Sequence, residues 1–360
     1  MKLQRLVVEG FRSIDAVTWT PGDLTVLTGS RADDLCAAAL HVANTALGWG
    51  GFREGFDAEA PHPPERFTDG FAETRCFVRM APRECESLCF GYELLLERIA
   101  ANNGWAIVYE RFTLDDDFDL RELLERQGSR AVYTLSPKAS ARAGARAPKE
   151  QVVTVAEDMP ALGAIAGFAS DPRVRPYAER LEGWRRHARI DPSTEGAPRR
   201  FVAEPVFHDR LSADGRNLVN ALYSLWDFET LRAPILLGLR TLDPTVANLR
   251  FTVSEDGKLS VALAHEGDRT TDLATMDDAT VAWMLRGAML CAVTPAPLLI
   301  IEVPQADIPD ALLGALAAML RVGATRTQVA LLGVSPALDV ALTAAFAGMD
   351  DGPKLVRSEP

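Results

Sequence analysis

In the C-terminal third of the chain, continuous apolar runs alternate with segments whose apolar residues have helical spacing. Residues 298–301 and 329–332 are continuous apolar runs, which is typical of strands buried on both faces of a sheet. Apolar residues at helical spacing follow each run, at residues 310–322 and 338–346. Because strands and helices alternate, the pattern predicts right-handed parallel crossovers and an α/β fold.

The N-terminal half alternates polar and apolar residues instead. Residues 1–20 predict a first strand that enters a turn at Phe11-Arg12-Ser13, and residues 24–27 predict a second strand, followed by a turn and an alanine-rich helix to about residue 47. A Gly- and Pro-rich loop is expected at residues 48–70. Three further strands are predicted at residues 74–80, 88–97 and 105–114, and the turn-forming segments between them favour an antiparallel meander. Two short strands are expected at residues 131–135 and 151–155.

The middle of the chain has helical spacing from residue 160 to residue 231 without sustained heptads, which indicates a helical insertion and not a coiled-coil arm. We then expect a helix at residues 235–242, a hairpin of residues 249–253 and 259–265, and an amphipathic helix at 279–293. The expected organisation is one domain, 1–360, with an N-terminal lobe at 1–159, a helical insertion at 160–232 and a C-terminal lobe at 233–360.

The composition is that of a protein with a sizeable core, since 48% of the 360 residues are hydrophobic. No apolar run has the length of a membrane span, and the first residues lack a signal-peptide core, so we expect a cytoplasmic protein without membrane contact. The cysteines are odd in number and form no CxxC pair, which favours buried free thiols over disulfides or a metal site. They are Cys36, Cys76, Cys85, Cys89 and Cys291.

A net charge of −12 argues against a surface that binds nucleic acid over its whole extent, because neutralisation of phosphates dominates such binding. The charge is uneven, however. Residues 138–200 carry 12 Lys and Arg against 8 Asp and Glu. The first part of this basic region, PKASARAGARAPKE, has no apolar periodicity, so we expect a solvated loop, with contact to an acidic partner as the alternative.

The segment LTVLTGSRADDLC, residues 24–36, predicts a strand, a tight turn and a helix, which is the local architecture that cradles a phosphate in P-loop proteins. Gly29 stands where the motif G-x-x-x-x-G-K-[ST] begins, so Asp34, Leu35 and Cys36 fall at the second glycine, the lysine and the hydroxyl. Leu35 offers a phosphate no charge. We expect Asp33 and Asp34 to cap free N–H groups of the helix, for about 0.3–1 kcal/mol each.

Four stretches together resemble the compact ABC-type AAA ATPases of the RecF, SMC and OLD group. They are LQRLVVEGFRSIDAVTWTPGDLTVLTGS at the start, LSADGRNLVNALYSL from Leu211, PAPLLIIEVP from Pro295 and QVALLGVSPALD from Gln328. In that family the first contains the strand into the P-loop, the second a D-G-x-N-L helix start, the third the Walker B strand and the fourth the switch histidine. The resemblance implies a P-loop NTPase head of ABC type, with a mixed or parallel core sheet.

The family's catalytic residues are replaced at each of these elements. Glu302-Val303-Pro304-Gln305 stands for E-E-P-E, so one carboxylate is left near a metal position and Val303 cannot polarise water. We favour Glu302 as a strand-end carboxylate bonded to a neighbouring turn. Asp277-Asp278-Ala279-Thr280 replaces the signature S-D-G and is typical of a helix start. Val334 replaces the switch histidine in Gly333-Val334-Ser335-Pro336.

The leading hypothesis is therefore a pseudo-ATPase without cofactor or metal, a scaffold or regulatory subunit that forms a homodimer or pairs with an intact ATPase. One alternative is a working ATPase of DNA repair or phage defence that uses ATP and Mg²⁺ at an unorthodox site. Another is a cleft recruited for a different ligand or reaction. The histidines are scattered and form no Ser-His-Asp, paired-carboxylate or metal-ligand spacing. They are His41, His62, His187, His208 and His265.

Overall fold

The computed structural model describes residues 2–47, 73–81, 89–99, 104–116, 119–135, 150–165, 171–187, 190–303, 308–347 and 352–359. The loop expected at 48–70 lies outside these ranges, as do Cys85, His62, Pro304, Gln305 and residues 138–149, 166–170 and 188–189 of the basic region. The chain divides into two compact units. Unit 1 comprises Met1–Pro21, Thr28–Trp184 and Ser358–Pro360, and unit 2 comprises Gly22–Leu27 and Arg185–Arg357. Residues 160–232, the expected helical insertion, are thus shared between the two units.

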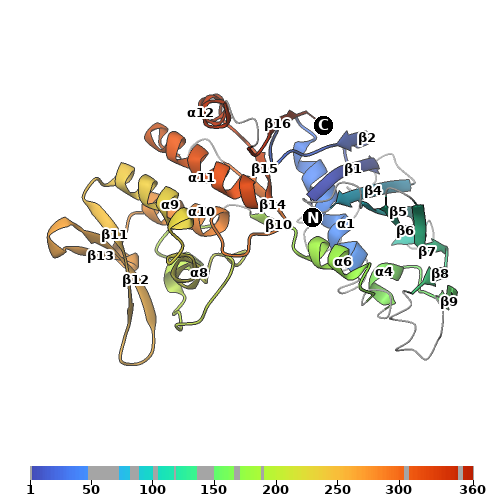
Figure 1. Cartoon of the computed structure of the whole chain (residues 1–360), viewed down its shortest axis with the longest axis horizontal. Helices are drawn as coiled ribbons and strands as arrows, with labels where there is room; N and C mark the ends of the chain where they lie inside the picture. Colours follow the sequence, from blue (N-terminus) through green and yellow to red (C-terminus); the bar gives the residue numbers. More distant parts are fainter. Residues whose placement is uncertain are drawn as a thin grey trace. The chain divides into compact units, whose positions relative to one another are not determined.

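Unit 1 is built on an eight-stranded sheet in the order β2-β1-β4-β5-β6-β7-β8-β9 (Figure 1). The strands are β1 (Lys2–Phe11), β2 (Ile14–Trp19), β4 (Glu73–Ala81), β5 (Cys89–Ile99), β6 (Gly104–Asp116), β7 (Asp119–Gln127), β8 (Arg130–Thr134) and β9 (Glu150–Thr154). All seven neighbouring pairs are antiparallel. The predicted meander is therefore present, and it includes β7, which the sequence pattern does not predict.

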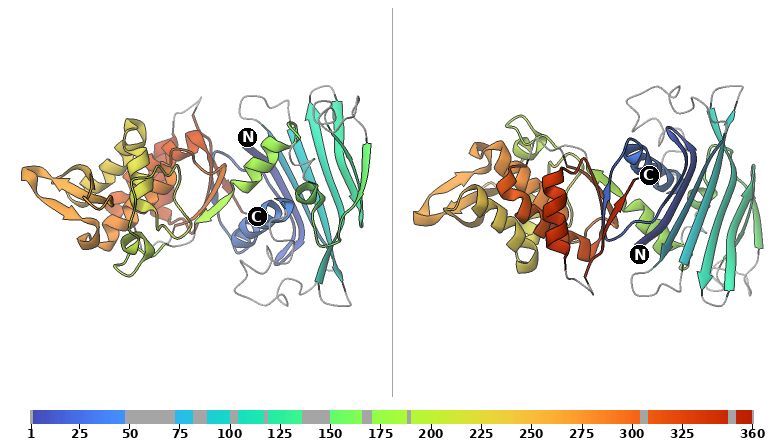
Figure 2. Two further views of the ribbon diagram at one scale, coloured as in Figure 1. Left: turned by 90° about the horizontal axis from the view of Figure 1, so that it is seen from below. Right: turned by 90° about the horizontal axis from the view of Figure 1, so that it is seen from above.

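Helices α1 (Ala32–Leu47), α4 (Ala161–Ala164) and α6 (Arg175–Glu182) lie on one face of this sheet (Figure 2). Alternate residues of the strands face these helices; in β4, for example, Cys76, Val78 and Met80 are buried. On the other face, charges pair across neighbouring strands, as in Arg111 Nε with Glu122 at 2.8 Å. The two faces follow from the period of two in a half-buried strand.

A fully buried ion pair fastens α4 to the sheet. The Glu110 carboxylate accepts the N–H groups of Ala161 at 2.6 Å and Leu162 at 2.8 Å and the Tyr92 hydroxyl at 3.0 Å. It lies 3.6 Å from Arg126, which donates to backbone carbonyls, among them that of Ala156. Burial raises the pKa of Glu110 and lowers that of Arg126. Removal of either partner would leave an uncompensated buried charge.

Unit 2 contains a five-stranded sheet in the order β10-β14-β15-β3-β16. Its strands are β10 (Arg185–His187), β14 (Leu298–Glu302), β15 (Gln328–Leu332), β3 (Leu24–Leu27) and β16 (Leu355–Ser358). The first four pair in parallel. Helix α11 (Leu313–Arg326) forms the predicted crossover between the parallel strands β14 and β15, and helix α12 (Pro336–Phe346) follows β15 as predicted. Every residue of β3 and β15 is buried, as the apolar runs predict.

The remainder of unit 2 packs helices and a small sheet around one hydrophobic core. The helices are α7 (Ala197–Arg200), α8 (Leu218–Leu225), α9 (Glu229–Leu242) and α10 (Asp278–Leu290). The predicted hairpin is formed by β11 (Val246–Val253) and β12 (Leu259–His265), and β13 (Thr270–Asp272) adds a third strand. Among the described helices, none combines the length and the hydropathy that crossing a bilayer requires.

Four of the cysteines, Cys36, Cys76, Cys89 and Cys291, are described, and all are free and buried, as expected from the sequence. Burial raises the pKa of the Cys76 and Cys291 thiols to about 12. Both thiols therefore remain protonated near neutral pH and are poor nucleophiles and metal ligands.

Candidate functional site

The turn after β3 is too short for the phosphate-binding loop that its sequence position predicts. Four residues, 28–31, separate the last residue of β3 from Ala32 at the start of α1. Gly29 has a φ of +87°, so the tight glycine turn itself is present. A P-loop extends through its second glycine before the lysine, but here the helix begins two residues before Asp34. The first turn of α1 thus takes the place of the loop.

Leu35, at the position of the lysine, is completely buried, and so is its neighbour Cys36. A lysine contributes to phosphate binding through a charge that reaches the ligand. The side chain at this position instead contributes to the core of unit 1, so its direction as well as its chemistry differs from that of a P-loop lysine.

The end of the chain covers the same turn. The Thr28 N–H donates to the carbonyl of Ser358 at 3.1 Å. A Cβ atom placed on Gly29 would lie 3.1 Å from Cγ and 3.3 Å from Oε1 of Glu359. A carboxylate side chain therefore lies against the glycine where an anionic ligand would have to approach.

Asp34 does not act as the helix cap that we expected. Its carboxylate accepts hydrogen bonds from Arg12 Nη1 at 3.3 Å, from the Ser13 N–H at 3.3 Å and from the Ser13 hydroxyl at 2.5 Å. These donors belong to the turn between β1 and β2, where Arg12 has a φ of +50°. Asp34 thus joins α1 to this turn. Asp33 lies exposed in the first turn of α1.

His41 lies deeper in α1, against the same turn. Its ring centroid is 5.7 Å from that of Phe11. Burial, and then the positive charge of Arg12, lower the pKa of His41 to about 4. The imidazole is therefore neutral near neutral pH. In unit 2, burial and the charge of Arg185 likewise lower the pKa of His187 to about 4.

Glu302 ends β14 as expected, but its partner is a neighbouring strand and not a turn. Arg186, on β10, donates to Oε1 of Glu302 through Nε at 3.1 Å and also through Nη2. The next residue, Val303, is buried, and its N–H donates to the carbonyl of Leu332 at 2.8 Å. The carboxylate that would support a metal is thus neutralised by an arginine.

The switch-like segment is a glycine turn followed by a capped helix. Gly333 has a φ of +70°, and Val334 packs against the core of unit 2. The Ser335 hydroxyl accepts the N–H of Leu338 at 3.1 Å and so caps α12. No side chain in this segment reproduces the hydrogen-bonding capacity of a histidine at position 334.

The signature-like residues form a helix start, as the sequence predicts. Asp277 accepts the Thr280 N–H at 2.9 Å and the Thr280 hydroxyl at 2.7 Å. Burial opposes ionisation of Asp277, but these hydrogen bonds outweigh it and lower its pKa. Asp278 pairs with Arg199 at 2.5 Å, and Ala279 is exposed. Both carboxylates therefore already have partners at the start of α10.

The D-G-x-N-L segment retains a complete polar network. Asn217 Oδ1 accepts the Ser212 N–H at 2.7 Å, and Nδ2 donates to the carbonyl of Arg210 at 3.0 Å and lies 2.9 Å from Nδ1 of His208. Asp214 accepts the Arg216 N–H and side chain. These contacts shape the loop that leads into α8.

His265 belongs to a polar cluster that the sequence did not reveal. Its Nε2 lies 2.9 Å from the Thr271 hydroxyl, and its Nδ1 lies 3.3 Å from Asp243 and 3.1 Å from Arg269 Nη2. An Asp-His-Thr line is therefore present. Nδ1 also lies 3.0 Å from the Thr245 hydroxyl, which donates to Asp243 at 2.7 Å. The network therefore holds the end of β12 against the loop that precedes β11.

The arginines of the basic region are largely paired where the structure describes them. Their carboxylate partners are Asp171 for Arg173, Glu179 for Arg175, Glu302 for Arg186, Asp278 for Arg199 and Glu195 for Arg200. Within the described residues of this region, these ion pairs neutralise most of the arginines, and much of the rest of its positive charge, at 138–149 and 189, lies outside the described ranges.

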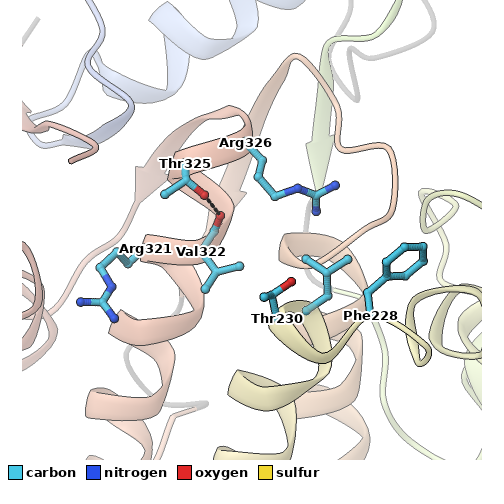
Figure 3. Close-up of a pocket in the computed structure, with 7 residues that line it drawn as sticks. Phe228, Thr230, Arg321, Val322, Thr325 and Arg326 are labelled. Atoms are coloured by element: carbon cyan, nitrogen blue, oxygen red, sulfur yellow. Dashed lines mark hydrogen bonds between the residues drawn. The ribbon is translucent and has the colours of Figure 1, made fainter. Parts of the chain in front are cut away.

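A cavity of about 360 Å³ in unit 2 lies between the start of α9 and the end of α11, and Figure 3 shows its lining. Its two arginines, Arg321 and Arg326, point away from each other. Arg326 already donates to the carbonyls of Ala292 and Val293 at 2.6 and 2.5 Å. This arrangement does not converge on a phosphate. Within the described residues, no group of three or more His, Cys, Asp or Glu could hold a metal ion.

Comparison with known proteins identifies the fold. No family model matches the chain, and no curated protein matches it. A crystal structure of an SMC head bound to the C-winged helix domain of ScpA matches with a TM-score of 0.53 and 10% identity, over 95% of this chain and 92% of that one. The chain thus has the ABC-type ATPase fold of an SMC head.

Two further solved structures match less well. The SMC head domain from Thermotoga maritima has a TM-score of 0.41 and 12% identity, over 95% of this chain and 92% of that one. The Smc head with an extended coiled coil, bound to the C-terminal domain of ScpA derived from Pyrococcus furiosus, has a TM-score of 0.46 and 11% identity, over 94% and 91%.

Proposed function

We propose that this protein is a pseudo-ATPase, an SMC-head-like chain that binds no nucleotide and serves as a scaffold or regulatory subunit. The observation that carries the proposal is the burial of Leu35 in a helix that begins where a phosphate-binding loop should run. Nucleotide binding at this turn would require a positively charged donor there, and Glu359 instead brings a carboxylate to Gly29. Like charge disfavours an incoming triphosphate.

The Walker B-like strand supports the same proposal independently. Glu302 is engaged by Arg186, and Val303 has neither a charge nor a free N–H to offer. A Mg²⁺ ion needs oxygen ligands that converge on it, and displacement of the arginine would cost an ion pair. The alternative of a working ATPase would require each of these contacts to be replaced.

A protein partner is the second part of the proposal. Residues 201–207 of unit 2, which we call the apolar patch, contain four apolar side chains that are 48–59% exposed: Phe201, Val202, Val206 and Phe207. The segment is held in place, because Asn220 Nδ2 donates to the carbonyls of Glu204 at 2.6 Å and Val206 at 2.9 Å. Apolar side chains held exposed in this way favour a protein interface. The matching SMC head was solved with ScpA bound, and for this chain we propose a second copy or an intact ATPase.

Calorimetry with Mg-ATP tests the first part. We expect no binding heat up to millimolar ATP, and no turnover. Glu302→Gln is the matched variant, since it removes only the charge of the Walker B-like carboxylate. ATP binding by the natural chain that is lost in this variant would show a working site and overturn the proposal.

Affinity purification from the native cell, followed by mass spectrometry, tests the second part. Phe207→Asp should release the partner, because a carboxylate would have to be buried in the interface. Val340→Asp is the control, since Val340 is 70% exposed on α12, outside the patch. Recovery of a lone monomer with the natural chain would contradict the scaffold role, whatever the outcome of the ATP experiment.

A further inference from the structure

A second cavity, of about 350 Å³, lies within unit 2 beside the ends of β14 and β15. Val303, which follows β14, and Ala337 and Leu338, in the first turn of α12, are among its lining residues. In open α/β sheets the carboxyl ends of the strands are where ligands bind. The volume falls within the range of small-molecule sites, roughly 300–1,000 Å³.

The wall of this cavity combines polar and apolar surface. Its apolar part comes from Ile308, which precedes α11, from Leu313 at the start of α11, and from Val303 and Leu338. The apolar side chain of Val303 stands where the resembling ATPases have a carboxylate. A site with this lining binds a hydrophobic body and gains from the removal of apolar surface from water.

Asp310 supplies the charge at this cavity. Its carboxylate is exposed, and in the described part of the chain it has no ion pair or hydrogen bond, whereas Glu302 and Asp339 nearby in the fold are paired with arginines. The start of α12 also borders the cavity, but the Ser335 hydroxyl already accepts the Leu338 N–H. Pro336 has no N–H to donate. Among the described lining residues, Asp310 therefore supplies the charge.

We propose that this cavity binds a small organic amine, with its apolar body against Val303 and Leu338 and its ammonium group at Asp310. The cavity shares Val303 and Ser335 with the Walker B-like and switch-like segments, but the proposal concerns a ligand without phosphate, so its test is independent of the Mg-ATP calorimetry. Three probes of equal body and different head group test it: phenethylammonium, 2-phenylethanol and 3-phenylpropionate, each titrated while ligand signals are followed by saturation-transfer NMR.

Phenethylammonium should bind at least about tenfold more tightly than 3-phenylpropionate, which corresponds to roughly 1.4 kcal/mol. Asp310→Asn should reduce this preference to less than about twofold, since it keeps the shape and removes the charge. Ala337→Trp should abolish binding of all three probes, because Ala337 is an exposed lining residue and the indole would occupy the cavity. Val340→Trp, on the exposed side of the same helix, is the control.

Three results would overturn the proposal. The first is an absence of binding to the natural chain at tens of millimolar probe. The second is equal binding by the Ala337→Trp and Val340→Trp variants, which would place the probes elsewhere. The third is a preference for the amine that survives in Asp310→Asn. Circular dichroism of each variant establishes that it is folded, so loss of binding is read from folded protein.

Discussion

Helices α1 and α8 both follow a glycine in the left-handed conformation, with φ of +87° at Gly29 and +72° at Gly215. Their polar side chains differ in where they bind. Before α8, Asn217 and Asp214 bond within their own loop. At α1, Asp34 reaches a distant turn between β1 and β2. One helix start is organised by its own sequence, and the other by the rest of unit 1.

This difference separates two kinds of position in a chain that has the fold of an SMC head at 10% identity. Asp214 and Asn217 hold backbone groups in place, and Asn217 is itself buried, so its amide needs partners. Leu35 and Val303 are buried apolar residues, at positions where our proposal assigns no ligand contact. In our proposal, the fold persists because the retained polar residues stabilise it without a nucleotide.

Leu35→Lys tests the α1 side of the comparison most directly. If the position were a disabled ligand site, restoring the lysine would favour ATP binding. Because Leu35 is completely buried, we expect instead a loss of about 3–5 kcal/mol in unfolding free energy from an uncompensated buried charge, and no ATP binding. Urea denaturation measures the first and calorimetry the second. Leu237→Lys, on an exposed part of α9, should change stability by less than about 0.5 kcal/mol.

The acid sensitivity of unit 1 gives the next largest effect. The pKa of His41 is lowered to about 4 in the folded chain, so below pH 6.5 the unfolded chain binds a proton that the folded chain does not. Its contribution to stability is present above pH 6.5 and is lost as the pH falls towards 4, by on the order of 3 kcal/mol. His41→Phe should weaken the pH dependence of urea denaturation between pH 6.5 and 4. An unchanged pH profile would contradict the buried, neutral histidine.

Much of the fold could be predicted because its signals are local. The apolar runs of β14 and β15 and the turn at 255–257 are readable in a few residues each. Strand β7 was missed because its sequence, DLRELLERQ, is mostly charged and adopts a strand through pairing with β6 and β8. β10 is only three residues long, and its pattern falls within a helical stretch.

The contacts of the candidate site could be predicted only in part. Asp277 was recognisable as a cap because its partner, Thr280, is three residues away. Arg186 and Glu302 are 116 residues apart, and Asp34 and Arg12 are 22 apart, so nothing in the local pattern joins them. The burial of Leu35 is likewise a property of the packed unit, since an isolated turn and helix would leave either side of the helix open.

Asn217→Ala tests the α8 side of the comparison. The amide joins Ser212, Arg210 and His208, and its loss removes three partly buried hydrogen bonds, so we expect about 2 kcal/mol of destabilisation. Asn217→Asp keeps the acceptor for the Ser212 N–H and loses the donor, so its stability should lie between those of the natural chain and Asn217→Ala. A change below about 0.5 kcal/mol in urea denaturation would mean that this network does not hold the loop.

Asp34→Ala should have the smallest effect, about 1 kcal/mol, since Arg12 and Asp34 are each partly exposed and the loss is chiefly that of hydrogen bonds to one carboxylate. The position of the amides whose hydrogen exchange changes distinguishes the two roles of Asp34. If Asp34 holds the β1–β2 turn, hydrogen exchange should quicken at the Ser13 amide and stay unchanged in the first turn of α1. Asp277→Ala, where the carboxylate caps its own helix, should instead quicken exchange at Thr280 within α10. If exchange instead quickens in the first turn of α1 and not at Ser13, Asp34 caps its own helix. The starts of α1 and α8 would then differ only in the groups that their polar side chains bond.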